Sequence, residues 1–332
     1  MDLFTFPFMQ RALLAALFTG LAAPAVGTYL VQRRLALMGD GLGHVAVTGV
    51  ALGLLTKTSP TWTAVVVAVL GAVLIEVIRE RGHTNGDVAL ALLFYGGLAG
   101  GVLLTGLGDQ SASRLQEYLF GSITTISEGD VVTTMVLAAV VIAIAVGLAP
   151  QLFAVAQDQE FARVAGLDVR AYNLLVAVLA AVSVTVAMRT VGLLLVSALM
   201  VVPVATSQQL TRSFRATLVA AMGLGMLASV GGLVVSAFAS AHARVAPGAT
   251  IVLLALAGFV VTWPVGAWLR RRARLRAPFP AGVAEDDHVT TDEHPHEHGR
   301  DCGHVAVPHG DHVDYVHGSH RHAVHGRHYD EH

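Results

Sequence analysis

Long apolar runs separated by short polar stretches make up the chain from its start to about residue 270. A helix needs about 20 mostly apolar residues to cross a bilayer. Runs of this kind cover residues 9–32, 35–56, 60–78, 87–107, 131–156, 170–188, 191–209, 214–239 and 248–269. The pattern therefore predicts an all-α, polytopic integral membrane protein with about eight or nine transmembrane helices.

The run over residues 191–209 contains Pro203. Proline lacks the backbone N–H that a helix needs and breaks or kinks it. Broken helices occur in transporters where the freed backbone groups line a cavity or contact other helices. We therefore expect a broken helix at Pro203.

Composition supports a membrane protein. Hydrophobic residues make up 54% of the 332 residues and charged residues 13%, whereas soluble domains average about 45–50% and 25%. Because so little charge cannot cover a water-facing surface, much of the apolar surface must face lipid. A single cysteine, Cys302, excludes an intrachain disulfide framework.

The chain changes character after residue 276. Thirteen of its sixteen histidines lie between His288 and His332, among Asp, Glu, Gly and Pro. A segment with so few apolar residues cannot bury enough surface to fold alone. We expect a transmembrane domain over residues 1–276 and a disordered, His-rich tail over residues 277–332.

The tail offers groups that bind metals. Imidazole and thiolate are good zinc ligands and poorer ligands for magnesium or manganese. The candidates are His294, His296, His298, Cys302, His304, His320 and His322. They favour weak, multi-site zinc binding, in which the tail is an acceptor, a buffer or an inhibitor of transport. The alternative is a solvated end whose metal binding is incidental.

The basic residues predict the orientation, because cytoplasmic loops carry an excess of Lys and Arg. With nine spans and the N-terminus outside, thirteen basic residues of the first domain lie on the inner side and five on the outer side. We therefore expect a multi-pass protein of the bacterial inner membrane, with its N-terminus outside and its C-terminus inside.

Two ionisable residues, Asp40 and His44, lie inside the second run, where charge is costly and marks functional sites. They are four residues apart, so a helix places them on one face. A carboxylate with an imidazole suits zinc, manganese or iron. The structural alternative is that they hydrogen-bond each other or a neighbouring helix. Glu76 also lies in an apolar run, but beside Arg79 near its end, and we expect an interfacial ion pair there.

A charged stretch lies between the fifth and sixth runs, on the predicted inner side. The charged Glu160 and Arg163 flank the apolar Phe161 and Ala162 there, and Gly166 is expected to end a short helix. An amphipathic helix of this kind can dock in a groove of a soluble partner. The alternative is a helix that lies on the membrane surface.

No phosphate-binding loop of the form Gly-x-x-x-x-Gly-Lys-Ser/Thr occurs in the chain, and its first domain has no hydrolase motif. We therefore expect a transport subunit that is not itself an enzyme. A partner must supply the energy.

Four stretches together resemble the zinc/manganese/iron ABC permease family. They are Met38–Gly53, Tyr118–Ile123, Gln159–Leu167 and Val191–Thr206. They occur in the family's order within residues 8–270, and four ordered motifs are far more specific than one. Gly41 and Gly43 depart from the family pattern, since bulkier or hydroxyl residues are common there, and the His-rich tail is not a general family feature.

The resemblance implies a homodimeric permease, surrounded by lipid, that imports a divalent transition metal. Its partners would be one cytoplasmic ABC ATPase per protomer and an extracytoplasmic metal-binding protein, with no nucleic acid and no permanently bound cofactor. Asp40 and His44 would lie on the translocation path. The residues of the ATPase-coupling segment would be Glu160, Phe161, Ala162, Arg163 and Gly166.

The tail favours zinc as the transported metal, with manganese and iron as alternatives. The main rival function is a self-sufficient secondary zinc carrier or exporter with a His-rich regulatory tail. Such a carrier would need a fuller set of intramembrane ligands than Asp40 and His44. A membrane metal sensor that transports nothing is a third class.

Overall fold

The computed structural model describes residues 6–80, 86–107, 118–119, 121, 127–188, 192–240, 245–276, 289–291, 298–299, 301–309, 312–317, 320–325 and 328–331. The chain divides into two compact units, Met1–Trp263 and Pro264–His332. The division falls inside the last helix.

The apolar runs form helices. These are α1 (Pro7–Gln32), α2 (Met38–Leu55), α3 (Pro60–Glu80), α4 (Gly86–Gly106), α6 (Glu128–Gly147), α7 (Ala149–Gln157), α8 (Gln159–Val164), α9 (Val169–Ala187), α10 (Leu193–Leu210), α11 (Phe214–Ala239) and α12 (Pro247–Arg276). Among the described residues, eight helices are long and apolar enough to cross a membrane, and α10 contributes a shorter apolar stretch, Val196–Leu210. The predicted polytopic all-α fold with eight or nine spans is confirmed.

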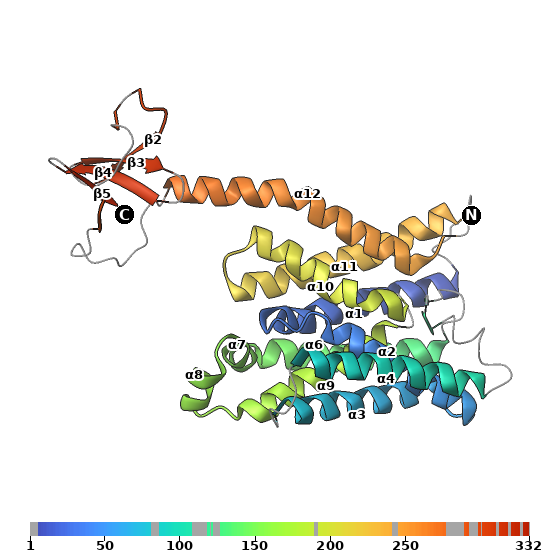
Figure 1. Cartoon of the computed structure of the whole chain (residues 1–332). Coiled ribbons are helices and arrows are strands. Elements are labelled where there is room, and N and C mark those ends of the chain that lie inside the picture. The colour runs from blue at the N-terminus through green and yellow to red at the C-terminus, as the bar shows by residue number, and fades with distance from the viewer. Residues whose placement is uncertain are drawn as a thin grey trace. The chain divides into compact units, whose positions relative to one another are not determined.

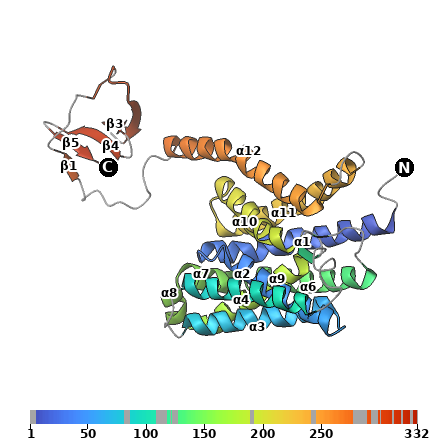
Figure 2. The same ribbon diagram turned by 45° about the vertical axis from the view of Figure 1, so that its right-hand side comes forward.

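The long helices of the first unit run side by side, with α1 and α2 inside the bundle (Figures 1 and 2). Helix α1 packs against α6, α9, α10 and α11, and α2 packs against α3, α4, α9 and α10. The apolar window is 72% buried in α2 but only 17% buried in α4. The side chains that α4 exposes include Leu92 and Val102, which suits a surface that faces lipid.

Small residues allow the helices of the first unit to approach closely. A Cβ atom at Gly20 of α1 would lie 2.7 Å from the carbonyl oxygen of Gly225 in α11, so only glycine fits at this crossing. Between α1 and α6, the Tyr29 hydroxyl donates a hydrogen bond of 2.6 Å to the carbonyl oxygen of Ala145. These contacts fix α1 in the centre of the bundle.

Helix α10 differs from the expected broken helix, because it continues through Pro203. Two hydroxyl groups bond to carbonyl groups around the proline, Thr206 to Val202 and Ser207 to Val204, each at 2.8 Å. Neither hydroxyl bonds to the carbonyl of Leu199, which is the group that the missing N–H of Pro203 leaves without its helical donor.

The described part of the tail forms an antiparallel sheet in the order β1-β5-β4-β3-β2. Its strands are β1 (Val289–Thr291), β2 (Val305–His309), β3 (His312–His317), β4 (His320–His325) and β5 (His328–Glu331). This differs from the expectation of a disordered tail. The sequence His-Gly-x-His recurs where successive strands meet, and paired runs separated by two residues including glycine are a hairpin pattern.

Alternation along the strands gives the tail sheet two faces. Val307, Asp314 and Ala323 are cross-strand neighbours on one face and are all buried. Tyr315 and His322 are neighbours on the other face. This register brings the few apolar residues of the tail onto one face, where they form a small core that the composition does not predict.

Candidate functional site

Asp40 lies in the first turn of α2 and is half-buried. A carboxylate in the first turn is favoured by the positive end of the helix dipole, which accounts for its tolerance there. Within the described residues, Asp40 forms no hydrogen bond or ion pair. Its oxygens are thus available to a cation.

His44, one turn further along α2, is 8% exposed. Its ring meets the edge of the Phe94 ring in α4, with 4.1 Å between the centroids. Its Nδ1 atom is buried and has no hydrogen-bond partner within the described part of the chain. Buried polar atoms are normally paired, so this nitrogen is free to accept a bond from water or to bind a ligand.

The backbone of α2 is held tightly at His44. A Cβ atom at Gly97 of α4 would lie 2.9 Å from the carbonyl oxygen of His44 and 2.6 Å from the amide nitrogen of Val45. The Thr48 hydroxyl donates a hydrogen bond of 2.6 Å to the carbonyl oxygen of Gly97. Because α4 rests directly on this turn of α2, the backbone that carries the imidazole is held in place.

Glu76 is more buried than an interfacial ion pair would be. Its carboxylate is 2.9 Å from Arg79 and 3.8 Å from Arg33, and the Glu76 side chain is only 5% exposed. Burial lowers the pKa of the Arg33 guanidinium, and attraction to Glu76 opposes that shift. The sequence predicts the pairing of Glu76 with Arg79. It does not predict the contact with Arg33, which connects α3 to the end of α1.

The predicted amphipathic segment is the six-residue helix α8. Asp158 begins it by accepting hydrogen bonds from the backbone of Glu160 and Phe161, at 2.9 and 3.0 Å. Gly166, at a φ of 85°, ends it, with backbone bonds from Gly166 to Arg163 and from Leu167 to Ala162. Both signals follow the rules for helix ends.

The apolar residues of α8 divide between two environments. Ala162 is fully buried against Val155 and Val169. Phe161 is 66% exposed and Val164 is 89% exposed. Two large apolar side chains are thus left uncovered beside the exposed charges of Glu160 and Arg163.

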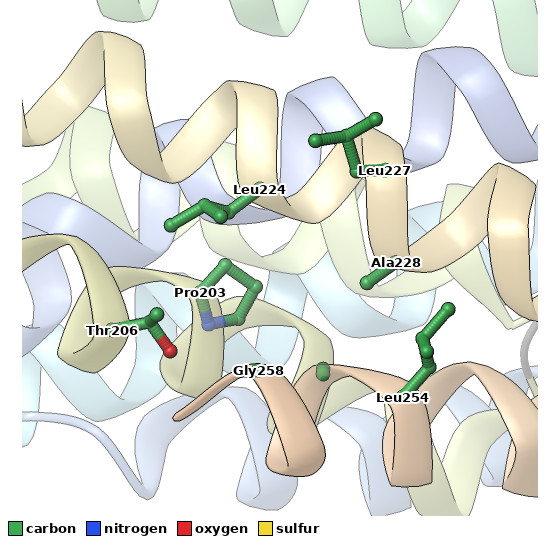
Figure 3. A pocket seen from close by; sticks show the side chains of 8 residues that line it. Pro203, Thr206, Leu224, Leu227, Ala228, Leu254 and Gly258 are labelled. Atoms are coloured by element: carbon green, nitrogen blue, oxygen red, sulfur yellow. The ribbon is translucent and has the colours of Figure 1, made fainter. Parts of the chain in front are cut away.

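Pro203 lines an apolar cavity of about 230 Å³ between α10, α11 and α12. Figure 3 shows Leu224, Leu254 and Gly258 around the ring of Pro203, with the Thr206 hydroxyl as a polar group. Neither Asp40 nor His44 lines this cavity. Its chemistry suits packing or an apolar occupant rather than a metal ion.

Three of the predicted tail ligands lie together. His298, Cys302 and His304 place ligand atoms within 4.8 Å of one another, and Cys302 Sγ is 3.7 Å from His298 Nδ1. The other nitrogen of His298, Nε2, is 3.3 Å from His322 Nδ1. His322 is therefore placed to orient His298 rather than to share its metal-facing atom.

The other three tail ligands that the sequence predicts lie outside the residues or side chains that the structure describes. His294 and His296 lie outside the described residues, and His320 is described by its backbone alone.

A second group in the tail has no counterpart among the predicted ligands: His309, His312 and Asp314. The carboxylate of Asp314 is fully buried. Burial lowers the pKa of the neighbouring Arg321, and attraction to Asp314 opposes this shift. The group escapes sequence reasoning because the three residues share a face only in the hairpin register.

Comparison with known proteins gives a consistent result. The model of the ABC 3 transport family matches residues 5–265. The manganese import system permease protein ScaB of Streptococcus parasanguinis is 32% identical over 259 residues, covering 78% of this chain and 90% of that protein. The high-affinity zinc uptake system membrane protein ZnuB of Haemophilus influenzae is 27% identical, covering 70% and 89%.

The fold is also found among solved structures. The structure described as PsaBC from Streptococcus pneumoniae in complex with Fab aligns with a TM-score of 0.71 and 30% identity, covering 81% of this chain and 96% of that one. The family match ends before the tail sheet begins.

Proposed function

The chain belongs to the ABC 3 transport family, and from this premise we propose that it is the permease of a zinc importer. As a member of that family it is the membrane subunit of a metal ABC importer, and ATP hydrolysis belongs to a separate subunit. This membership sets aside the self-sufficient carrier.

The Asp40–His44 pair carries the proposal for the translocation path. It combines a half-buried carboxylate and a buried imidazole nitrogen, neither of which has a partner within the described residues. Leaving a buried polar group unpaired costs about 1–3 kcal/mol. A divalent cation passing along α2 would satisfy both groups.

The ligands of the tail support the choice of zinc in this proposal. Relatives are named for manganese and for zinc, and an aspartate with a histidine suits either metal. The cluster of His298, Cys302 and His304 presents nitrogen and sulfur ligands, which zinc prefers and manganese does not. A cytoplasmic segment with these ligands fits a cell that imports zinc.

The proposed assembly is a homodimer with one ATPase per protomer and an extracytoplasmic metal-binding protein. Helix α8 would dock on the ATPase through Phe161 and Val164, whose exposure leaves an apolar contact surface. The predicted orientation places this helix and the tail in the cytoplasm, where the ATPase is found.

Reconstitution tests the function as a whole. We expect proteoliposomes that contain the chain and its copurifying ATPase to take up zinc only with ATP. Zinc should stimulate uptake at a lower concentration than manganese or iron in a competition assay. If manganese reached half-maximal stimulation of uptake at a lower concentration than zinc, the choice of zinc would be wrong. Proton-driven flux through the chain alone would overturn the importer.

A further inference from the structure

The tail hairpin formed by β2 and β3 carries a compact group of ligands that the transport function does not use. His309 and His312 face each other across the hairpin, and Asp314 lies two residues beyond His312 on the same face. The two imidazole rings are 5.0 Å apart between centroids. The register alone thus gathers three zinc-ligand side chains at one end of the sheet.

The distances between these groups match those around a bound ion. Asp314 Oδ2 is 3.6 Å from His309 Nδ1, and Asp314 Oδ1 is 3.3 Å from His312 Nε2. A tetrahedral zinc ion with bonds of about 2.0–2.1 Å separates neighbouring ligand atoms by about 3.3 Å. The side chains would need only small adjustments to hold one ion.

The buried carboxylate is the observation that points to a cation. Asp314 is 0% exposed, and neither of its oxygens has a hydrogen-bond partner within the described part of the chain. A buried carboxylate without hydrogen bonds is disfavoured, and a bound cation would stabilise it. The side chains of His309 and His312 are 39% and 38% exposed, so both imidazoles are open to solvent beside the buried carboxylate.

We propose that His309, His312 and Asp314 form a preformed zinc site with an open fourth coordination position. Sites with four protein ligands hold structural zinc, whereas three ligands leave a position for water or an incoming ligand. The nearby positive charge of Arg321 weakens the attraction for a dication. The site therefore suits zinc that exchanges with the cytoplasm.

This site is separate from the cluster at Cys302. His298 stacks on Tyr315, with ring centroids 5.1 Å apart, and Tyr315 alternates with Asp314 along β3. The two groups therefore lie on opposite faces of the sheet. A substitution in one can be tested while the other serves as an internal control.

Histidine-specific acylation, read by peptide mass spectrometry, tests the site on the full chain in detergent. Labelling of His309 and His312 is measured across a series of buffered free-zinc concentrations. We expect zinc to protect both residues with a single midpoint. In Asp314→Asn this midpoint should rise by roughly tenfold or more, because losing a ligand costs at least as much as losing an outer-shell partner.

His304→Ala is the matched control on the opposite face and should leave the midpoint at His309 and His312 unchanged. His309→Ala removes a part-exposed ligand with little risk to folding, and it should raise the midpoint at His312. An unchanged midpoint in Asp314→Asn and His309→Ala, or an equal rise in His304→Ala, would overturn the site. The readout needs neither ATPase nor transport, so its failure leaves the proposed importer untouched.

Discussion

Asp40 and His44 are the two residues on which metal passage depends in this proposal. Their side chains differ in burial, since His44 is locked against Phe94 while Asp40 is half-exposed. A buried imidazole beside a more exposed carboxylate can bind a cation and release it again. This division of roles leads to a prediction for each residue.

Asp40→Asn and His44→Gln should each lower the rate of ATP-dependent zinc uptake about tenfold or more, because each removes a metal ligand and keeps the side-chain size. The measurement is isotope uptake in proteoliposomes at equal protein content. Asp130→Asn is the control, since Asp130 belongs to the capping box of α6 and its loss should cost about 1 kcal/mol of stability without changing zinc dependence. Normal uptake in both pair variants would remove Asp40 and His44 from the path.

Glu76 offers a contrasting case of an ionised residue with a structural role. Glu76→Gln should lower the free energy of unfolding by about 3–5 kcal/mol, because it leaves the buried Arg33 and the half-buried Arg79 without their counter-charge. Thermal unfolding in detergent measures the loss. Glu80→Gln breaks the exposed pair with Arg170 and should cost about 0–1 kcal/mol. Equal melting of the two variants would show that the Arg33–Glu76 contact stabilises nothing.

Helix α8 has the features that the proposed docking on the ATPase requires. Its ends are fixed by Asp158 and Gly166, and Ala162 anchors it to the neighbouring helices. Phe161 and Val164 are therefore presented on a rigid support. Exposed aromatic residues on rigid elements are frequent anchors of protein interfaces.

Phe161→Ser should weaken binding of the ATPase by about 2 kcal/mol or more, as expected for an aromatic anchor, and uncouple ATP hydrolysis from uptake. Stability should change by no more than about 0.5 kcal/mol, because the side chain is 66% exposed. Copurification and the ratio of hydrolysis to uptake are the measurements. Phe238→Ser, at an exposed phenylalanine of α11, should leave both unchanged. Normal ATPase binding in Phe161→Ser would reduce α8 to a surface loop.

The sequence predicts α8 and the long helices well because the signals involved are local. Apolar runs, the Asp158 cap and the glycine stop all act within a few residues. Pro203 is different, because its missing N–H predicts a break whereas the helix continues through it. Whether a proline breaks a membrane helix depends on the surrounding packing, which periodicity does not contain.

The tail shows more clearly that a sequence pattern does not predict contacts between distant residues. Its composition indicates disorder, yet the strands on either side of the repeated His-Gly-x-His sequence are paired, and this pairing buries Val307 and Ala323. The ligands His309, His312 and Asp314 become neighbours only through this register. Sequence reasoning finds the histidines by type, but it cannot say which of them share a face.

The chain joins a transport unit to a second unit that contains the proposed zinc site. A chain that ends after Arg276 should keep ATP-dependent uptake, because the family match ends at residue 265. Its response to rising internal zinc should be altered, because the tail ligands are gone. Uptake is measured in vesicles preloaded with buffered zinc, with full-length Asp314→Asn as the control for one site. An identical response in all three proteins would make tail metal binding incidental to transport.

The orientation of the molecule decides whether the tail can meet imported metal. Several spans end on the same predicted side of the membrane, and they are followed there by Arg33, Arg212 and helix α8. The excess of basic residues on this side predicts that it faces the cytoplasm. Cys302 is the only cysteine of the chain and is half-buried. A membrane-impermeant maleimide should therefore label it in inside-out vesicles and not in right-side-out vesicles.

Two variants in a Cys302→Ser background extend this measurement to the first unit. Phe6→Cys, at the part-exposed start of α1, should react only in right-side-out vesicles, and Arg34→Cys, at the exposed turn before α2, only in inside-out vesicles. One span separates the two positions, so their opposite reactivity follows from the fold. The reverse pattern would place α8 outside, where no ATPase could reach it.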